Sequence, residues 1–136
     1  MSFWLAKTEP NTFSYADLER LKKDMWDGVR NFTAAKHIKN MQPSDLILIY
    51  HSGKERAIVG VAEVTSDPYP DPTSSDSRFV TVDVIPCHRL HRPVTLREIK
   101  ALPAFANWEL VRQSRLSVMP VSESHWQLIM KLSAQP

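Results

Sequence analysis

Apolar residues in the first part of the chain change from a strand-like to a helix-like spacing. Residues 2–7 (SFWLAK) are predicted to form a strand. Ser14 and Asp17 follow in a capping-box-like S-x-x-D pattern, which predicts that a helix begins after Ser14. The apolar spacing continues this helix to about Lys23.

The helical pattern breaks at residues 25–31 (MWDGVRN), which predicts a loop. Asn31 is suited to cap a second helix. Apolar residues at helical spacing support this helix, namely Ala34, Ala35, Ile38 and Met41. Residues 42–45 (QPSD) predict the turn that follows it.

The pattern in the middle of the chain predicts β-structure. Residues 46–50 (LILIY) are a continuous apolar run, which is typical of a strand buried on both faces. Residues 52–56 predict a turn into a second strand at 57–64 (AIVGVAEV), so the two strands form a hairpin. Gly60 in the second strand indicates a bulge or a close backbone approach.

A proline-rich loop at residues 66–77 follows the hairpin. Residues 78–85 then alternate in polarity, which places valines on one face of a strand and Thr81 and Asp83 on the other. A further short strand is expected at residues 87–90.

The last part of the chain predicts short helices at residues 95–101 and 107–113, a return strand at 116–121, and a final helix capped by Ser122. The inward stripe of this final helix consists of Trp126, Ile129 and Met130. Strands that curl on themselves, with helices packed outside, predict an α+β fold built on a small mixed β-barrel.

Composition narrows the class of protein. A chain of 136 residues, 43% hydrophobic and 24% charged, predicts a single globular domain over residues 1–136. The lone cysteine, Cys87, permits no internal disulfide and no cysteine-rich metal site. No apolar run approaches the roughly 20 residues of a membrane helix, and the first residues lack the pattern of a signal peptide. We therefore expect a cytoplasmic protein without membrane attachment.

The formal net charge of +2 is mild, but the basic residues are grouped. One group lies between residues 86 and 115, and a second lies at residues 30–39. A solvated face explains either group alone, whereas two basic groups together with aromatic residues in loops favour nucleic-acid binding. The residues expected to contact phosphates are Arg30, Lys36, Lys39, Arg112 and Arg115.

Motifs that carry common catalytic chemistry are absent, among them G-x-S-x-G, H-E-x-x-H, the Walker loop and C-x-x-C. His88 and His91 are three apart on a predicted strand, so they face opposite sides and form a poor metal pair. Cys87 adjoins His88 and Ser52 adjoins His51, but neighbouring strand residues point apart. Cys87 is therefore expected to be a small buried apolar residue. The sequence predicts no catalytic set, no metal site and no cofactor.

Aromatic and polar residues gather at the ends of the predicted elements. If these ends converge, they form an aromatic-walled pocket with hydrogen-bonding groups, which suits a flat heterocycle such as a nucleobase. Trp26 is the central candidate, either as a pocket wall with much of one ring face open to solvent or as a core residue that fixes its loop. Core positions are expected for Trp4, Trp108 and Trp126. The candidate pocket residues are Lys7, Thr8, Glu9, Trp26, Asn31, Tyr50, Ser52, Tyr69 and Asp71.

Several stretches in series resemble the EVE domain family. In chain order they are residues 4–10 (WLAKTEP), 26–31 (WDGVRN), 50–52 (YHS), 59–64 (VGVAEV), 69–73 (YPDPT) and 115–118 (RLSV). The resemblance covers nearly the whole chain and implies a PUA-like fold. The EVE domain is similar in turn to the YTH domain, which reads methylated adenine in RNA through an aromatic cage.

The resemblance implies roles for some of the candidate residues. Trp26 matches a wall of the cage, and Lys7 and Thr8 match polar residues of the pocket floor. Ser52 lies at the corresponding strand end, and the later loop of the cage falls at residues 69–71. The family is associated with modified cytosines in DNA and, in bacteria, with modification-dependent restriction.

The sequence and the resemblance together favour a non-catalytic module that binds nucleic acid and accepts a modified base, such as 5-methylcytosine in DNA. Extruding a base costs a few kcal/mol, so phosphate contacts must support the pocket. The expected partners are modified nucleic acid and components of modification-dependent restriction. Three alternatives stay open: an RNA-binding PUA-like module that reads a modified RNA base, a small enzyme acting on a modified base or nucleotide, and a protein-interaction module.

Overall fold

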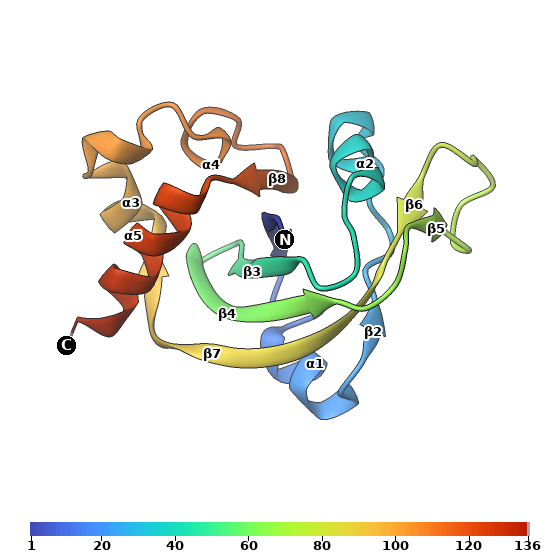
Figure 1. The fold of residues 1–136 in the computed structure, drawn as a ribbon, viewed down its shortest axis with the longest axis horizontal. Helices are drawn as coiled ribbons and strands as arrows, with labels where there is room; N and C mark the ends of the chain where they lie inside the picture. Colours follow the sequence, from blue (N-terminus) through green and yellow to red (C-terminus); the bar gives the residue numbers. More distant parts are fainter. Residues whose placement is uncertain (136) are drawn as a thin grey trace.

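A curled sheet forms the centre of the computed structural model, which describes residues 1–135 (Figure 1). The sheet runs in the order β2-β7-β4-β3-β1-β8, and only the pair of β1 and β3 is parallel. Its strands are β1 (Phe3–Thr8), β2 (Asp24–Met25), β3 (Leu46–His51), β4 (Ala57–Val64), β7 (Asp83–Thr95) and β8 (Val118–Val121). A separate two-stranded sheet pairs β5 (Tyr69–Pro70) with β6 (Val80–Thr81).

Helices surround this sheet, which confirms the expected α+β architecture. They are α1 (Tyr15–Leu21), α2 (Phe32–Lys39), α3 (Leu96–Lys100), the 3-10 turn η1 (Pro103–Phe105), α4 (Glu109–Arg112) and α5 (Glu123–Ala134). Helices α1 and α5 pack against β7, and α2 packs against β6 and β8 (Figure 1). In the part of the chain that the structure describes, no helix is long and apolar enough to cross a bilayer.

Local capping signals place the first two helices where the sequence predicted them. The Ser14 hydroxyl accepts from the Asp17 backbone N–H at 3.1 Å, and the Asp17 carboxylate accepts from the Ser14 backbone N–H at 2.8 Å. The Asn31 side chain accepts from the Ala34 backbone N–H at 3.0 Å. Asn31 therefore ends the loop after Trp26 by starting α2.

The sequence prediction was wrong about the length of β7. Separate strands at 78–85 and 87–90 were expected, but a single strand of 13 residues runs from Asp83 to Thr95 and contains Pro86 and Pro93. Its pairing with β4 shifts register twice, and such bulges let a strand bend and accommodate proline without ending. Thr81, expected on the face opposite the valines, is fully buried.

Gly60 lies where β4 meets α1. A Cβ atom at this position would lie 2.6 Å from the Tyr15 ring, so only glycine leaves room for that ring. The Tyr15 hydroxyl donates to the Val61 carbonyl oxygen at 2.8 Å. The pairing of β4 also shifts register beside Gly60, which confirms the predicted bulge. The group that approaches Gly60 is the Tyr15 ring and not a backbone segment.

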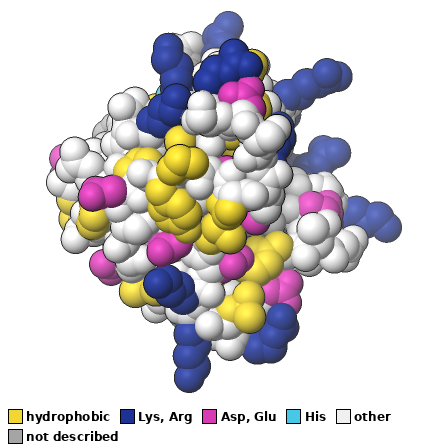
Figure 2. Space-filling model, turned by 90° about the vertical axis from the view of Figure 1, so that its right-hand side faces the viewer, with side chains coloured by type: hydrophobic (Ala, Val, Ile, Leu, Met, Phe, Trp, Pro, Cys, Tyr) yellow, Lys and Arg dark blue, Asp and Glu magenta, His cyan; other side chains and the backbone are white. Residues whose placement is uncertain are grey.

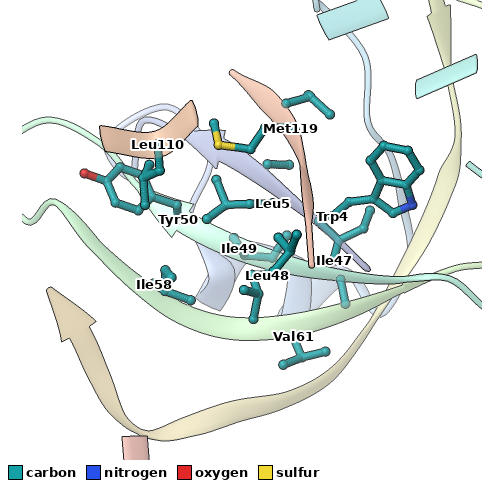
Figure 3. Packing of buried hydrophobic residues seen from close by; sticks show 14 of the residues in the cluster. Trp4, Leu5, Ile47, Leu48, Ile49, Tyr50, Ile58, Val61, Leu110 and Met119 are labelled. Atoms are coloured by element: carbon teal, nitrogen blue, oxygen red, sulfur yellow. The ribbon is translucent and has the colours of Figure 1, made fainter. Parts of the chain in front are cut away.

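The core lies between the sheet and the elements that cover it. Leu5 of β1, Ile47 and Leu48 of β3, and Met119 of β8 are fully buried (Figure 3). Trp4 joins them and donates its indole N–H to the buried Asp45 carboxylate at 3.0 Å. Core positions are likewise confirmed for Trp108 and Trp126.

Candidate functional site

A cavity of about 550 Å³ lies beside the end of β1, next to β2 and the loop that follows it. The residues that line it are Lys7, Thr8, Thr12, Phe13, Asp24, Met25, Trp26, Asp27, Gly28, Val29, Arg30 and Ser117. We call this space the Trp26 cavity. Its volume falls within the range of small-ligand pockets, roughly 300–1,000 Å³.

Trp26 borders this cavity but is only 8% exposed, so the expectation of a largely open ring face is wrong. The Trp26 backbone N–H donates to the Val82 carbonyl oxygen at 2.8 Å and extends the pairing of β2 with β7. This bond holds the indole against the core, where the Phe13 ring meets it edge-on at 6.2 Å. Trp26 is therefore a core residue that also borders the cavity.

The indole N–H of Trp26 distinguishes this side chain from Trp4 and Trp108. Those two donate to the Asp45 carboxylate and to the Pro120 carbonyl oxygen, respectively. Within residues 1–135, the Trp26 N–H has no hydrogen-bond acceptor, and its nitrogen is not fully enclosed. It is consequently available to a ligand.

The loop after Trp26 is held by Asp71, which reaches it from the proline-rich segment. The buried Asp71 carboxylate accepts from the Gly28 backbone N–H at 2.8 Å and from the Arg30 guanidinium at 3.0 Å. The Thr73 backbone N–H and hydroxyl also donate to it, at 2.8 and 2.6 Å. Burial alone would raise the pKa of Asp71, but the bonds from Thr73, Gly28 and Arg30 lower this pKa to about 2. Asp71 therefore positions the cavity wall and does not line the cavity.

Arg30 lies at the cavity, and both terminal nitrogens of its guanidinium group make hydrogen bonds. It donates to Asp71 at 3.0 Å and to the Thr73 hydroxyl at 2.8 Å, and its side chain is still 42% exposed. The guanidinium carbon lies 5.4 Å from the centroid of the Phe79 ring. Arg30 thus presents a fixed positive charge beside the cavity.

Lys7 borders both the Trp26 cavity and a second cavity of about 370 Å³. Its ammonium group donates to the Ser114 carbonyl oxygen at 2.9 Å, and burial lowers its pKa. Tyr50 and Ser52 line this second cavity together with Arg56 and Lys100. The structure therefore brings Tyr50 and Ser52 near Lys7 but not into the Trp26 cavity.

Asn31, Arg112 and Arg115 line a third cavity, of about 330 Å³. Ser114 belongs to both the second and the third cavity, so the three spaces follow one another around residues 114–117. Arg112 and Arg115 are exposed at this position. Cationic residues therefore line the Trp26 cavity, namely Lys7 and Arg30, and the third cavity, namely Arg112 and Arg115.

The remaining predicted residues lie outside these three cavities. The Glu9 carboxylate accepts from the Asn11 backbone N–H at 2.9 Å, and the Tyr69 hydroxyl donates to the Asp83 carboxylate at 2.6 Å. Lys36 and Lys39 are exposed on α2. None of these four side chains lines the spaces described above.

Sequence reasoning missed Phe13, Asp24 and Ser117 as residues of the Trp26 cavity. Phe13 follows the K-T-E-P stretch and Asp24 precedes Met25-Trp26, so their places next to motifs were the available signal. Ser117 reaches the cavity because its carbonyl oxygen accepts from the Lys7 backbone N–H at 2.8 Å. No local sequence pattern predicts this contact, because Lys7 and Ser117 are far apart in the sequence.

The neighbours of the candidate nucleophiles do not activate them. His51 Nε2 accepts from the Tyr15 backbone N–H at 3.0 Å, so Nδ1 carries the proton that faces Glu55 at 2.8 Å. The Ser52 hydroxyl donates to the Thr8 carbonyl oxygen at 3.3 Å and not to His51. The expectation of a buried Cys87 is wrong, because residues 87–89 of β7 lie at the surface. Among residues 1–135, no three His, Cys, Asp or Glu side chains are grouped to hold a metal ion.

Acidic neighbours neutralise part of the basic group at residues 86–115. Arg89 pairs with Glu19 at 2.6 Å, and Arg92 pairs with Glu98 at 2.7 Å. On the face shown in Figure 2, Lys and Arg side chains project mainly from the periphery, with Asp and Glu side chains between them. The molecule therefore has local basic positions and no uniformly positive face in this view.

Comparison with known proteins places the chain in a family. The model of the EVE domain matches residues 2–132. A protein of Schizosaccharomyces pombe is 33% identical, over 98% of this chain and 69% of its own length. A protein of Rhodopseudomonas palustris, solved by NMR, is 38% identical with a TM-score of 0.92, over 98% of this chain and 93% of the other.

A human relative has been solved with its ligand. Human THYN1, in complex with DNA that contains 5-methylcytosine, is 26% identical to this chain with a TM-score of 0.92, over 100% of this chain and 99% of the other. The expected PUA-like α+β fold is confirmed by this likeness. The match over nearly all of its length shows that the chain belongs to the EVE domain family.

Proposed function

We propose that this protein binds nucleic acid and accepts a modified base, 5-methylcytosine in DNA, in the Trp26 cavity without changing it chemically. The observation that carries the proposal is the cavity itself, whose lining combines a mostly buried tryptophan with polar residues and an anchored arginine. The complex of human THYN1 with DNA containing 5-methylcytosine supports the choice of ligand.

The chemistry of the lining suits a flat, partly polar ligand. Phe13, Met25, Trp26 and Val29 supply apolar surface, which a base and its methyl group can contact. Thr8 and Thr12 add hydroxyl groups at the same cavity. An apolar wall with a few polar groups is the usual composition of a site that fixes the orientation of a small ligand.

Cations beside the cavity supply the contacts that base extrusion requires. Extrusion costs a few kcal/mol, and phosphate contacts contribute affinity independent of sequence. Arg30 and Lys7 border the Trp26 cavity, while Arg112 and Arg115 lie around the third cavity. We propose these four residues as phosphate contacts and assign Lys36 and Lys39 a peripheral part, because they lie outside the cavities.

Binding without catalysis is the simplest reading of the site. His51 is engaged by Tyr15 and Glu55, so it is not positioned to take the Ser52 proton. A nucleophile without a base or metal is poorly activated near neutral pH. In bacteria, a reader of this kind would direct components of modification-dependent restriction to marked DNA.

Binding of matched oligonucleotides tests the proposal. Single-stranded and duplex DNA with one cytosine or one 5-methylcytosine, and RNA of the same sequence, are titrated at several stated salt concentrations. We expect methylated DNA to bind at least about tenfold more tightly than its unmodified counterpart, which corresponds to about 1.4 kcal/mol. Equal affinity for the two DNAs would refute the proposal, and stronger binding to methylated RNA would favour the RNA-reading alternative.

A further inference from the structure

We infer that Asp24 makes the Trp26 cavity selective for a base that presents an amino group, and so separates 5-methylcytosine from thymine. This inference rests on the proposed function and names the polar edge of the base that the cavity reads. Thymine is the informative competitor because it also carries a methyl group at C5, whereas its exocyclic group is an oxygen acceptor in place of an amino donor.

The strand β2 brings Asp24 and Trp26 to the same side. Asp24 pairs with Val84 and Met25 with Asp83, and the Trp26 backbone N–H continues the ladder to Val82. Side chains two residues apart on a strand share a face. Asp24 and Trp26 therefore lie on one side of β2, and both line the cavity.

The carboxylate of Asp24 differs from its acidic neighbours because no other side chain donates to it within residues 1–135. Asp71 accepts from Gly28, Arg30 and Thr73, whereas Asp83 accepts from Tyr69. Asp24 is half-buried, and burial is the main reason that its pKa is raised; the Met25 backbone N–H lowers this pKa in part, and Asp27 and Asp83 raise it slightly. A partly dehydrated acceptor without a side-chain donor gains most from a hydrogen bond that a ligand supplies.

Asp24 and Trp26 together offer one acceptor and one donor. The indole N–H of Trp26 has no acceptor within the described chain, so it remains for a ligand atom. The Watson–Crick edge of cytosine presents the amino donor next to the N3 acceptor, which matches a cavity whose lining residues offer one carboxylate and one indole N–H. Thymine presents O4 and N3–H instead, which would set an oxygen against the carboxylate. A site built to bond a polar group rejects an analogue that leaves its own groups unpaired.

Apolar contact cannot make this distinction. Phe13, Met25 and Val29 meet the methyl group of either base equally, because both carry it at the same ring position. The preference for methylated over unmethylated cytosine and the preference for 5-methylcytosine over thymine therefore depend on different residues. This separation allows the inference to fail while the proposed function stands.

The experiment compares three single-stranded DNAs of identical sequence that carry 5-methylcytosine, cytosine or thymine at one position. For the unaltered protein, we expect 5-methylcytosine to bind at least about tenfold more tightly than thymine. Asp24→Asn, whose amide offers a donor as well as an acceptor, should lose most of this preference and still bind the methylated strand more tightly than the cytosine strand. Equal binding of 5-methylcytosine and thymine by the unaltered protein would overturn the inference.

Asp27→Asn is the matched control, because Asp27 also lines the cavity but is exposed. It should keep the preference against thymine, and an equal loss in both variants would show that charge alone is responsible and would overturn the role of Asp24. Thermal melting establishes that both variants are folded. A protein that binds none of the three strands would refute the proposed function itself.

Discussion

The Asp71 carboxylate accepts a hydrogen bond from the Gly28 backbone N–H at 2.8 Å, although the two residues lie 43 positions apart. Gly28 has a φ of 80°, a backbone conformation that favours glycine. The bond ties the loop after Trp26 to the proline-rich segment between β5 and β6. Asp71 consequently fixes one wall of the Trp26 cavity from outside it.

Asp71→Asn should lower the free energy of unfolding by about 2–3 kcal/mol, because several donors lose a charged acceptor in a buried place. Urea denaturation followed by fluorescence measures this change. Asp76→Asn is the control, since Asp76 pairs with the exposed Arg78, and an exposed pair contributes less than about 1 kcal/mol. Equal effects of the two substitutions would show that Asp71 does not hold the loop.

Asp71 also predicts a specific response to acid. Its folded-state pKa of about 2 lies below the value of about 3.9 expected for an unfolded chain, so the bound carboxylate stabilises the fold above that value. This stabilisation is lost as the pH falls from about 4 toward 2. The difference in unfolding free energy between the unaltered protein and Asp71→Asn should therefore shrink across this interval. A difference that is constant with pH would contradict the assignment.

Trp26→Ala should destabilise the protein by roughly 3–5 kcal/mol, because the burial of the indole makes it a core residue as well as a cavity wall. Thermal melting and urea denaturation measure the loss. A drop below about 1 kcal/mol would show that the indole is not packed as described.

Trp26→Phe separates packing from hydrogen bonding at the same position. It keeps an aromatic ring against Phe13 but removes the indole N–H, so we expect a folded protein that binds the 5-methylcytosine strand at least about tenfold more weakly. The matched control is Trp126→Phe, since Trp126 is also 8% exposed but stacks on Phe3, away from the cavity. Comparable losses of binding in both variants would argue against a role for the Trp26 N–H.

The salt dependence of DNA binding should locate the phosphate contacts. If about three phosphates of duplex DNA are neutralised, the logarithm of the association constant should fall with that of the salt concentration with a slope near −3. Replacing both Arg112 and Arg115 by glutamine should reduce the magnitude of this slope by about 2. The same change at Lys36 and Lys39 should alter it less, because these residues lie outside the three cavities. A larger change in slope for the Lys36 and Lys39 variant than for the Arg112 and Arg115 variant would indicate that DNA binds at α2.

Local patterns predicted the elements of this fold better than their contacts. The capping box at Ser14 and the cap at Asn31 were predictable because each depends on residues within one helical turn. The irregularity at Gly60 was predictable from the glycine itself. The sequence did not show that Tyr15 fills the space beside it, because Tyr15 comes from α1, far away in the sequence. The bend that merges two expected strands into β7 depends on bulges opposite β4, which the spacing of residues 83–95 does not reveal.

In the candidate site too, the residues of the motifs were easier to predict than their burial and their contacts. The motifs grouped Lys7, Thr8 and Trp26, and these three residues line one cavity together with Arg30, which was expected only at the phosphates. They could not show that Trp26 is mostly covered, because its burial depends on the backbone bond to Val82. Tyr50 and Ser52 were grouped with these residues because they lie at the end of a strand. They line the second cavity instead, and Lys7 borders both cavities.

The place of β1 in the sheet has a consequence for the order of folding. This first strand lies between β3 and β8, and Phe3 to Ala6 pair with Val121 to Val118 from the other end of the chain. Pairing across such a distance in sequence forms slowly, since a long loop must close first. On the ribosome, β1 emerges before β8 and keeps an unpaired edge until β8 has been made. Because the Trp26 cavity requires Lys7 from β1 and Ser117 next to β8, a nascent chain completes this cavity only after β8 has been made.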